Sequence, residues 1–185
     1  GAGTAITVAK RSYKKEARTT ATAGIVGMIA AADGTTFTES SADSPADVTF
    51  QSNASARVPG QVVDAGYSVK TMPNSVAGTV TIPAPVVTAT GTTAVAVDTI
   101  YRSEIKTIPA ASACNATTFA AGASVIPSGV LSQPQSTAAL VLNANGANTI
   151  RYCTAITLLG TAPNNAQGAG ASVTWTFAAT SSVPS

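Results

Sequence analysis

Two cysteines, Cys114 and Cys153, are the residues of this chain most capable of a defined chemistry. They are too few for a structural zinc site, which takes four ligands, and the chain has no histidine to complete one. Two buried thiols are one interpretation of the pair. We expect a disulfide instead, because a core of small side chains needs reinforcement. A bridge closing a loop of about 40 residues is worth roughly 4 kcal/mol in the chain-entropy model.

The lack of histidine also removes Ser-His-Asp and Cys-His catalysis, imidazole metal sites and the usual pH switch. The carboxylates show no pairing of the kind that a glycosidase uses, and aromatic residues that could stack on sugars make up only 5% of the chain. These carboxylates are Glu16, Asp33, Glu39, Asp43, Asp47, Asp64, Asp98 and Glu104. We therefore expect no enzymatic activity, no metal and no cofactor.

Two short segments match the acceptor pattern for N-linked glycans, Asn53-Ala54-Ser55 and Asn115-Ala116-Thr117. A pattern of three residues also arises by chance in a chain rich in Asn, Ser and Thr. The functional interpretation gains support from the shortage of charge, because a glycan would hydrate an uncharged surface. Asn53 and Asn115 are therefore candidate N-glycosylation sites.

Charge is scarce throughout the chain and almost absent from its second half. Charged residues make up 10% of the sequence, where an ordinary soluble domain has about a quarter. After Lys106, Arg151 is the only side chain that is charged at neutral pH. Such a surface stays soluble when it is covered by copies of itself, by glycan, or by hydroxyls and amides. This pattern is typical of an extracellular structural or coat protein.

The positive charge is concentrated near the start of the chain. Five bases surround the single acid Glu16, which gives this stretch a balance of +4 within a total of +2. The bases are Lys10, Arg11, Lys14, Lys15 and Arg18. Such a segment can bind nucleic acid, an anionic membrane or an acidic neighbour, or it can be the solvated border of an edge strand. The segment is short and has one aromatic residue, Tyr13, so nucleic acid is not expected as a partner.

The elements that must position these residues are predicted to be short β-strands. Ala, Thr, Gly, Ser and Val dominate, and 15 glycines with 10 prolines supply many turns. The expected fold is an all-β sandwich, Ig-like or jelly-roll-like, with a thin core. Residues 33–47 look like a loop, and 19–32 form either a strand or a helix, too short to span a membrane. Other strands are expected at 1–8, 48–50, 61–63, 67–70, 76–82, 86–90, 93–97, 99–108, 125–126, 138–142, 149–159 and 172–177.

The N-terminal strand is the element most suggestive of assembly. Ala2, Ile6 and Val8 alternate with other residues and share one face, and the basic connector follows directly. We therefore divide the chain into an N-terminal strand with its connector, 1–18, and one sandwich domain, 19–185. A terminal strand on a tether either pairs within its own domain or inserts into the sheet of a neighbour. Repeated head to tail, that second contact makes a fibre.

The C-terminal sequence resembles a known class of filament subunit. The residues Asn148-Thr149-Ile150, and later the small-residue run Gly168 to Ser172 followed by Val173-Thr174-Trp175, look like the C-terminal part of bacterial chaperone–usher pilins. Those pilins end with a strand, a small-residue loop and a final alternating strand. Their low charge and Ala/Thr/Gly-rich composition are similar, and archaeal surface threads share that composition. The resemblance implies β-sandwich subunits joined by strand exchange, without enzymatic activity.

These observations together predict a structural subunit of an extracellular filament at the cell surface. Identical subunits are the expected partners, with Ala2, Ile6 and Val8 on the donor strand and glycan as a further addition. A viral or phage coat, tail or decoration protein is the first alternative, because it shares the β-rich composition and a basic arm. A secreted binding module, such as an adhesin, is the second.

Overall fold

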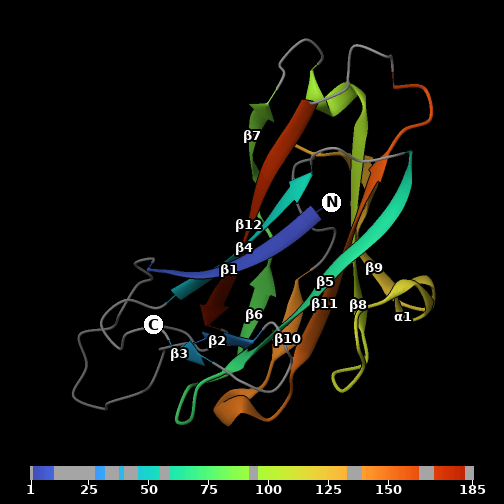
Figure 1. Ribbon diagram of the computed structural model, residues 1–185. Helices are drawn as coiled ribbons and strands as arrows, with labels where there is room; N and C mark the ends of the chain where they lie inside the picture. Colours follow the sequence, from blue (N-terminus) through green and yellow to red (C-terminus); the bar gives the residue numbers. More distant parts are fainter. Residues whose placement is uncertain are drawn as a thin grey trace.

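The computed structural model is built almost entirely of antiparallel strands (Figure 1). It describes residues 2–10, 28–31, 38–39, 46–54, 59–91, 96–132, 139–162 and 169–181. Within these ranges the strands form two six-stranded sheets, and one short α-helix accompanies them. The predicted all-β sandwich is therefore confirmed.

The first sheet is organised around its longest strand, β12. The order is β1-β4-β12-β6-β10, and β7 also pairs with β12. Every pairing is antiparallel. The strands are β1 (Ala2–Lys10), β4 (Ala46–Ala54), β6 (Gly78–Thr81), β7 (Val86–Gly91), β10 (Leu140–Leu142) and β12 (Ala169–Ser181).

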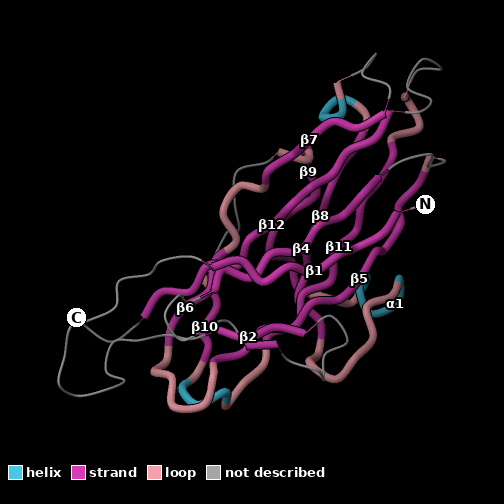
Figure 2. Tube along the Cα trace, turned by 60° about the vertical axis from the view of Figure 1, so that its left-hand side comes forward, coloured by secondary structure: helices cyan, strands magenta, loops and turns pink. Residues whose placement is uncertain are grey.

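The second sheet has the order β3-β2-β5-β11-β8-β9. Its pairings are antiparallel as well, so both sheets are of one kind. The strands are β2 (Met28–Ala31), β3 (Thr38–Glu39), β5 (Gly60–Thr71), β8 (Tyr101–Ile108), β9 (Ala123–Val130) and β11 (Ile150–Leu158). Figure 2 gives a second view of the two sheets.

The main core lies between the two sheets, where aromatic rings make the contact. Phe177 of the first sheet stacks on Tyr67 and Tyr152 of the second, with ring centroids 5.2 and 4.6 Å apart. Burial raises the pKa of both tyrosines, so they stay neutral. The alternation of buried Val173, Trp175 and Phe177 along β12 follows the period of two expected of a strand with one face in the core.

A smaller core covers the opposite face of the second sheet. It contains Ile108, Phe119, Cys153 and Ala155, with Cys114 packed against it. Phe119 comes from the helix α1 (Ala116–Ala120), and the Lys106 ammonium lies 4.6 Å from the centre of its ring. Figure 1 shows α1 on the side of this sheet away from β12. The second sheet is therefore covered on both faces, which explains the long buried run in β11.

Two prolines divide what would otherwise be one long strand beside β12. Strand β6 pairs with residues 178–181 of β12, and β7 pairs with residues 169–174. Both lie on the side of β12 opposite β4. Pro83 and Pro85 lie between them, and proline has no N–H to give to a ladder. The gap between β6 and β7 agrees with the prediction that these prolines exclude a central strand.

The structure corrects the predicted break within residues 61–70. These residues form one strand, β5, rather than two. The register with β11 shifts between Cys153 and Ala155, which face Gly66 and Val63, so that Asp64 and Ala65 lie opposite a single residue. The small and polar residues therefore mark a β-bulge and not a turn.

Other element predictions need smaller corrections. Residues 33–47 are not all loop, because β3 lies within them and β4 begins at Ala46. The expected hairpin partner at 93–97 ends in a 3₁₀ helix, η1 (Val97–Thr99), while β7 pairs with β12 instead; residues 93–95 lie outside the described part of the chain. For 19–32 the strand alternative holds at β2, and residues 19–27 lie outside the described part. The turn predicted at 143–146 contains the 3₁₀ helix η2 (Ala144–Gly146).

Candidate functional site

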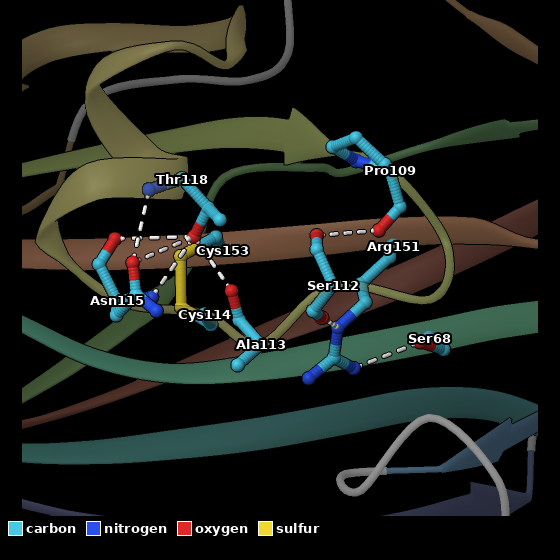
Figure 3. The surroundings of a disulfide bond; sticks show 9 residues. All are labelled: Ser68, Pro109, Ser112, Ala113, Cys114, Asn115, Thr118, Arg151 and Cys153. Carbon is cyan, nitrogen blue, oxygen red and sulfur yellow. Dashed lines mark hydrogen bonds between the residues drawn. A yellow bond between two sulfur atoms is a disulfide. The ribbon is translucent and has the colours of Figure 1, made fainter.

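The two cysteines form a disulfide that ties a surface segment to the second sheet. Cys114 lies just before α1, Cys153 lies in β11, and their Cα atoms are 5.4 Å apart (Figure 3). Cys153 is fully buried. The predicted disulfide is confirmed, and it fixes the start of α1 against the centre of the sheet.

Arg151, the only charged side chain after Lys106, holds the same segment from a second point. Its Nε donates to the carbonyl oxygen of Ser112 at 2.7 Å, and its Nη1 donates to the hydroxyl of Ser68 at 2.9 Å (Figure 3). Only 6% of its surface is exposed. A buried guanidinium needs such partners, because its desolvation is otherwise costly. The planar donor fork thus joins β11, β5 and the segment before the disulfide.

The guanidinium of Arg151 lies so close to Gly66 of β5 that no side chain fits there. A Cβ placed on Gly66 would lie 2.6 Å from Cζ of Arg151. We expect Gly66→Ala to lower the free energy of unfolding by about 1–3 kcal/mol, because the buried guanidinium must move from its hydrogen bonds. Urea titration followed by Trp175 fluorescence measures this change.

Gly160 offers the matched control for this prediction. A Cβ at Gly160 meets nothing within 4 Å, so Gly160→Ala should leave stability within about 0.5 kcal/mol of the parent. If Gly66→Ala is as stable as Gly160→Ala, the guanidinium is not held where the structure places it.

Asn115 begins α1 and caps it through a reciprocal pair of hydrogen bonds. Its Oδ1 accepts from the backbone N–H of Thr118 at 3.0 Å, and its own N–H donates to the Thr118 hydroxyl oxygen at 3.0 Å. This is the capping-box arrangement, with threonine in the position that Glu or Gln usually takes. Asn115 is exposed at the surface. The predicted acceptor is therefore held in a defined geometry, next to the disulfide (Figure 3).

The other predicted acceptor, Asn53, lies inside the first sheet. Its backbone is opposite Gly3 of β1 on one side and Ser172 of β12 on the other. The two predicted glycosylation sites thus belong to different sheets and are not brought together.

The N-terminal strand forms its ladder with one strand at the edge of the first sheet. All nine residues of β1 pair with β4 in an unbroken antiparallel register. Ala2, Ile6 and Val8 are opposite Ala54, Phe50 and Val48, and these three β4 residues are opposite Ala171, Trp175 and Phe177 of β12. The last three side chains are fully buried or nearly so. The predicted donor positions therefore lie in the same rows as the main core.

The carboxylates of the described residues make no cluster that could hold a metal ion. No group of three or more Cys, Asp or Glu side chains in the described ranges could hold a metal ion. Asp98 instead accepts hydrogen bonds from the hydroxyl and the backbone N–H of Ser132, which ties η1 to the turn after β9. Asp33 and Asp43 lie outside the described residues.

Two features of this site were missing from the sequence-based predictions. The sequence held a signal for the role of Arg151, because it is the only charged side chain in the long stretch after Lys106. The cap of α1 had a weaker signal in the sequence, because Asn115 is followed three residues later by Thr118.

No helix in the described part of the chain is long and apolar enough to cross a membrane. Comparisons of the chain with protein-family models, with curated proteins and with solved structures found no significant match.

Proposed function

We propose that this protein is a structural subunit of an extracellular filament, in which β1 of one copy pairs with β4 of the next. One observation carries the proposal: β1 is an edge strand whose whole ladder is made with β4, in register with the buried residues of β12. A second copy offers the same β4, so exchange conserves every backbone hydrogen bond. Exchanged elements of this kind are a low-cost route to assembly.

The chain between β1 and β2 is long enough for such an exchange. Residues 11–27 separate the two strands in the sequence. An extended chain spans up to about 3.3 Å per residue, so this length reaches a neighbouring sandwich without unfolding either domain. Because the donor and acceptor surfaces are different patches, the contact is head to tail, and it continues as a fibre when the rotation between copies does not close a ring.

Composition and cross-linking support a position outside the cell. The disulfide is stable in oxidising surroundings, such as the cell surface or the medium. The shortage of charge after Lys106 suits a protein covered by its own neighbours. The role requires no catalysis, metal or cofactor, and identical subunits are the partners.

Cysteine pairs test the exchange directly. Thr4 and Ser52 are opposite each other in the β1–β4 register, so Thr4→Cys in one copy and Ser52→Cys in another should cross-link when the two variants are mixed and assembled. A mass tag on one variant distinguishes this dimer from same-variant dimers on a non-reducing gel. Asn53→Cys replaces Ser52→Cys as the matched control, because a shift of one residue moves the thiol to the other face of the sheet.

The outcome that contradicts the proposal is equally specific. If the chain carrying both Thr4→Cys and Ser52→Cys closes its bridge only within itself, and mixed single variants never join, β1 stays in its own subunit. Electron microscopy of the same material supplies the second criterion. Fibres are expected; closed shells would favour the coat-protein alternative, and dispersed monomers at high concentration would favour a secreted binding module.

Removal of β1 should abolish polymerisation. A chain lacking residues 2–10 keeps the disulfide, the small core and the second sheet, but it has no donor strand. We expect it to sediment as a monomer, and a synthetic peptide of residues 2–10 should bind its free β4 edge. Val86→Ala on β7, where 66% of the valine is exposed, serves as the control that still polymerises. Polymer formed by the truncated chain would contradict strand exchange.

A further inference from the structure

The side-chain carbonyl oxygen of Asn115 faces α1, and the side-chain amide nitrogen faces away from the helix. The oxygen accepts a hydrogen bond from the backbone N–H of Thr118 at 3.0 Å, while the Thr118 hydroxyl donates its single proton to the carbonyl oxygen of Ala113 at 2.6 Å. Only an oxygen can accept from an N–H, so the cap assigns the orientation of the amide. The Nδ2 atom is therefore the one turned away from α1, and it makes no hydrogen bond with the described residues.

The acceptor pattern and the helix cap use different threonines. Thr118 serves the cap through its N–H and its hydroxyl. The hydroxyl that completes the acceptor pattern belongs to Thr117, an exposed residue on the first turn of α1. The two roles do not compete, so a substituent on Nδ2 leaves the cap intact.

We propose that Asn115 carries an N-linked glycan, whereas Asn53 does not. A polyprenyl-pyrophosphate oligosaccharide is the donor class. The bond between the anomeric carbon and the pyrophosphate oxygen breaks, a bond from that carbon to Nδ2 forms, and the amide loses one proton as the lipid pyrophosphate leaves. The linked amide keeps its carbonyl oxygen, which still accepts from Thr118. A nitrogen facing solvent beside a fixed cap is the observation that carries the assignment.

The position of α1 makes the modification compatible with the fold. Cys114 precedes Asn115 directly and is bonded to β11, so the attachment point is fixed on the outer face of the second sheet. Figure 1 places α1 far from β12, on the side opposite the first sheet. A glycan there hydrates the region around the uncharged segment that follows Lys106 and leaves the outer edge of β1 uncovered.

Asn53 differs because strands lie on both sides of it. Its backbone is paired with Gly3 of β1 and with Ser172 of β12, and neighbouring strands are about 4.8 Å apart, so the acceptor position is enclosed within the sheet. The folded sheet therefore disfavours a glycan at Asn53, while the surface segment at Asn115 has no flanking strand in the described part of the chain.

Peptide mapping of the protein from its native source tests the assignment. Cleavage after Lys and Arg places the two acceptors in different peptides, residues 19–57 and residues 107–151. After reduction and alkylation, the second peptide should be heavier by the mass of an oligosaccharide and the first should have its bare mass. Enzymatic release of N-linked glycan should then leave aspartate at position 115.

Variants made in the same source distinguish loss of the glycan acceptor from loss of the folded subunit. Asn115→Asp keeps an oxygen for the cap and removes the acceptor nitrogen, so the added mass should vanish while the subunit still folds. Thr117→Val should also remove it, and Thr117→Ser should restore it. The assignment is overturned by a bare 107–151 peptide, by glycan at Asn53 alone, or by added mass that persists in Asn115→Asp. None of these outcomes depends on whether the subunits form fibres.

Discussion

Replacement of Trp175 by alanine should lower the free energy of unfolding by about 3–5 kcal/mol, the usual cost of removing a large aromatic side chain from a core. Trp175 is fully buried at the middle of β12, with β4 on one side of that strand. The rest of the main core is made largely of Ile, Val, Leu and Tyr side chains, which are packed in place and cannot refill the space. A small domain has about 5–15 kcal/mol of stability in total, so this variant should be near the limit of folding.

Guanidinium titration of dilute subunits, followed by far-ultraviolet circular dichroism, measures this effect. Val86→Ala on β7 is the matched control, since it removes apolar atoms from a side chain that is 66% exposed, and its effect should stay within about 0.5 kcal/mol. Equal midpoints for the two variants would show that the two sheets do not pack on Trp175. Because Trp175 lies in the core of the subunit rather than on β1, the comparison is independent of filament formation.

Loss of the disulfide should lower the free energy of unfolding by about 4 kcal/mol, the chain-entropy value for its loop. The bridge joins residues 39 apart in sequence and holds the segment carrying α1 against β11. Its removal frees Cys114 in the unfolded chain and loosens the small core of Ile108 and Phe119 in the folded one. The double variant Cys114→Ala, Cys153→Ala is preferred, because a serine hydroxyl at the buried position 153 would add a penalty of its own.

Thermal and denaturant unfolding with and without a reductant provides the measurement. The parent protein should lose stability when the reductant is added, whereas the double alanine variant should be unchanged by it. If the oxidised and reduced parent proteins unfold at the same denaturant concentration, the bridge contributes nothing and the second core alone holds the segment.

The fold class was predictable because its signals are local and repeated. Alternation over 172–177 and the density of Thr, Val, Gly and Pro indicate strands and turns, and the structure confirms β12 there. The disulfide was predictable by elimination, since two cysteines in a histidine-free chain have few other uses. Pro83 and Pro85 were informative because the missing N–H is a backbone property that no packing can restore.

The remaining features depend on contacts between distant parts of the chain. Asp64 and Ala65 look like a turn in the sequence, but in the structure they form a bulge in β5, which pairs with β11 on both sides of it. The helix α1 is too short for a periodic pattern, and its stability comes from the Asn115 cap and from Phe119 in the small core. Arg151 meets Ser68 and Ser112, which lie 83 and 39 residues away in the sequence. No local pattern encodes such partners.

Because β12 lies at the centre of the first sheet, that sheet cannot be completed before the C-terminal strand is present. In the first sheet, β12 alone connects the β1–β4 pair to β6, β7 and β10, and it supplies Trp175 and Phe177 to the core. Until residues 169–181 have been synthesised, the strands of the first sheet can form only the pairs β1–β4 and β6–β10, and isolated pairs are marginal in water. Pairings across such long sequence separations also form slowly. The first sheet of a nascent chain therefore completes only when its C-terminal strand has been added.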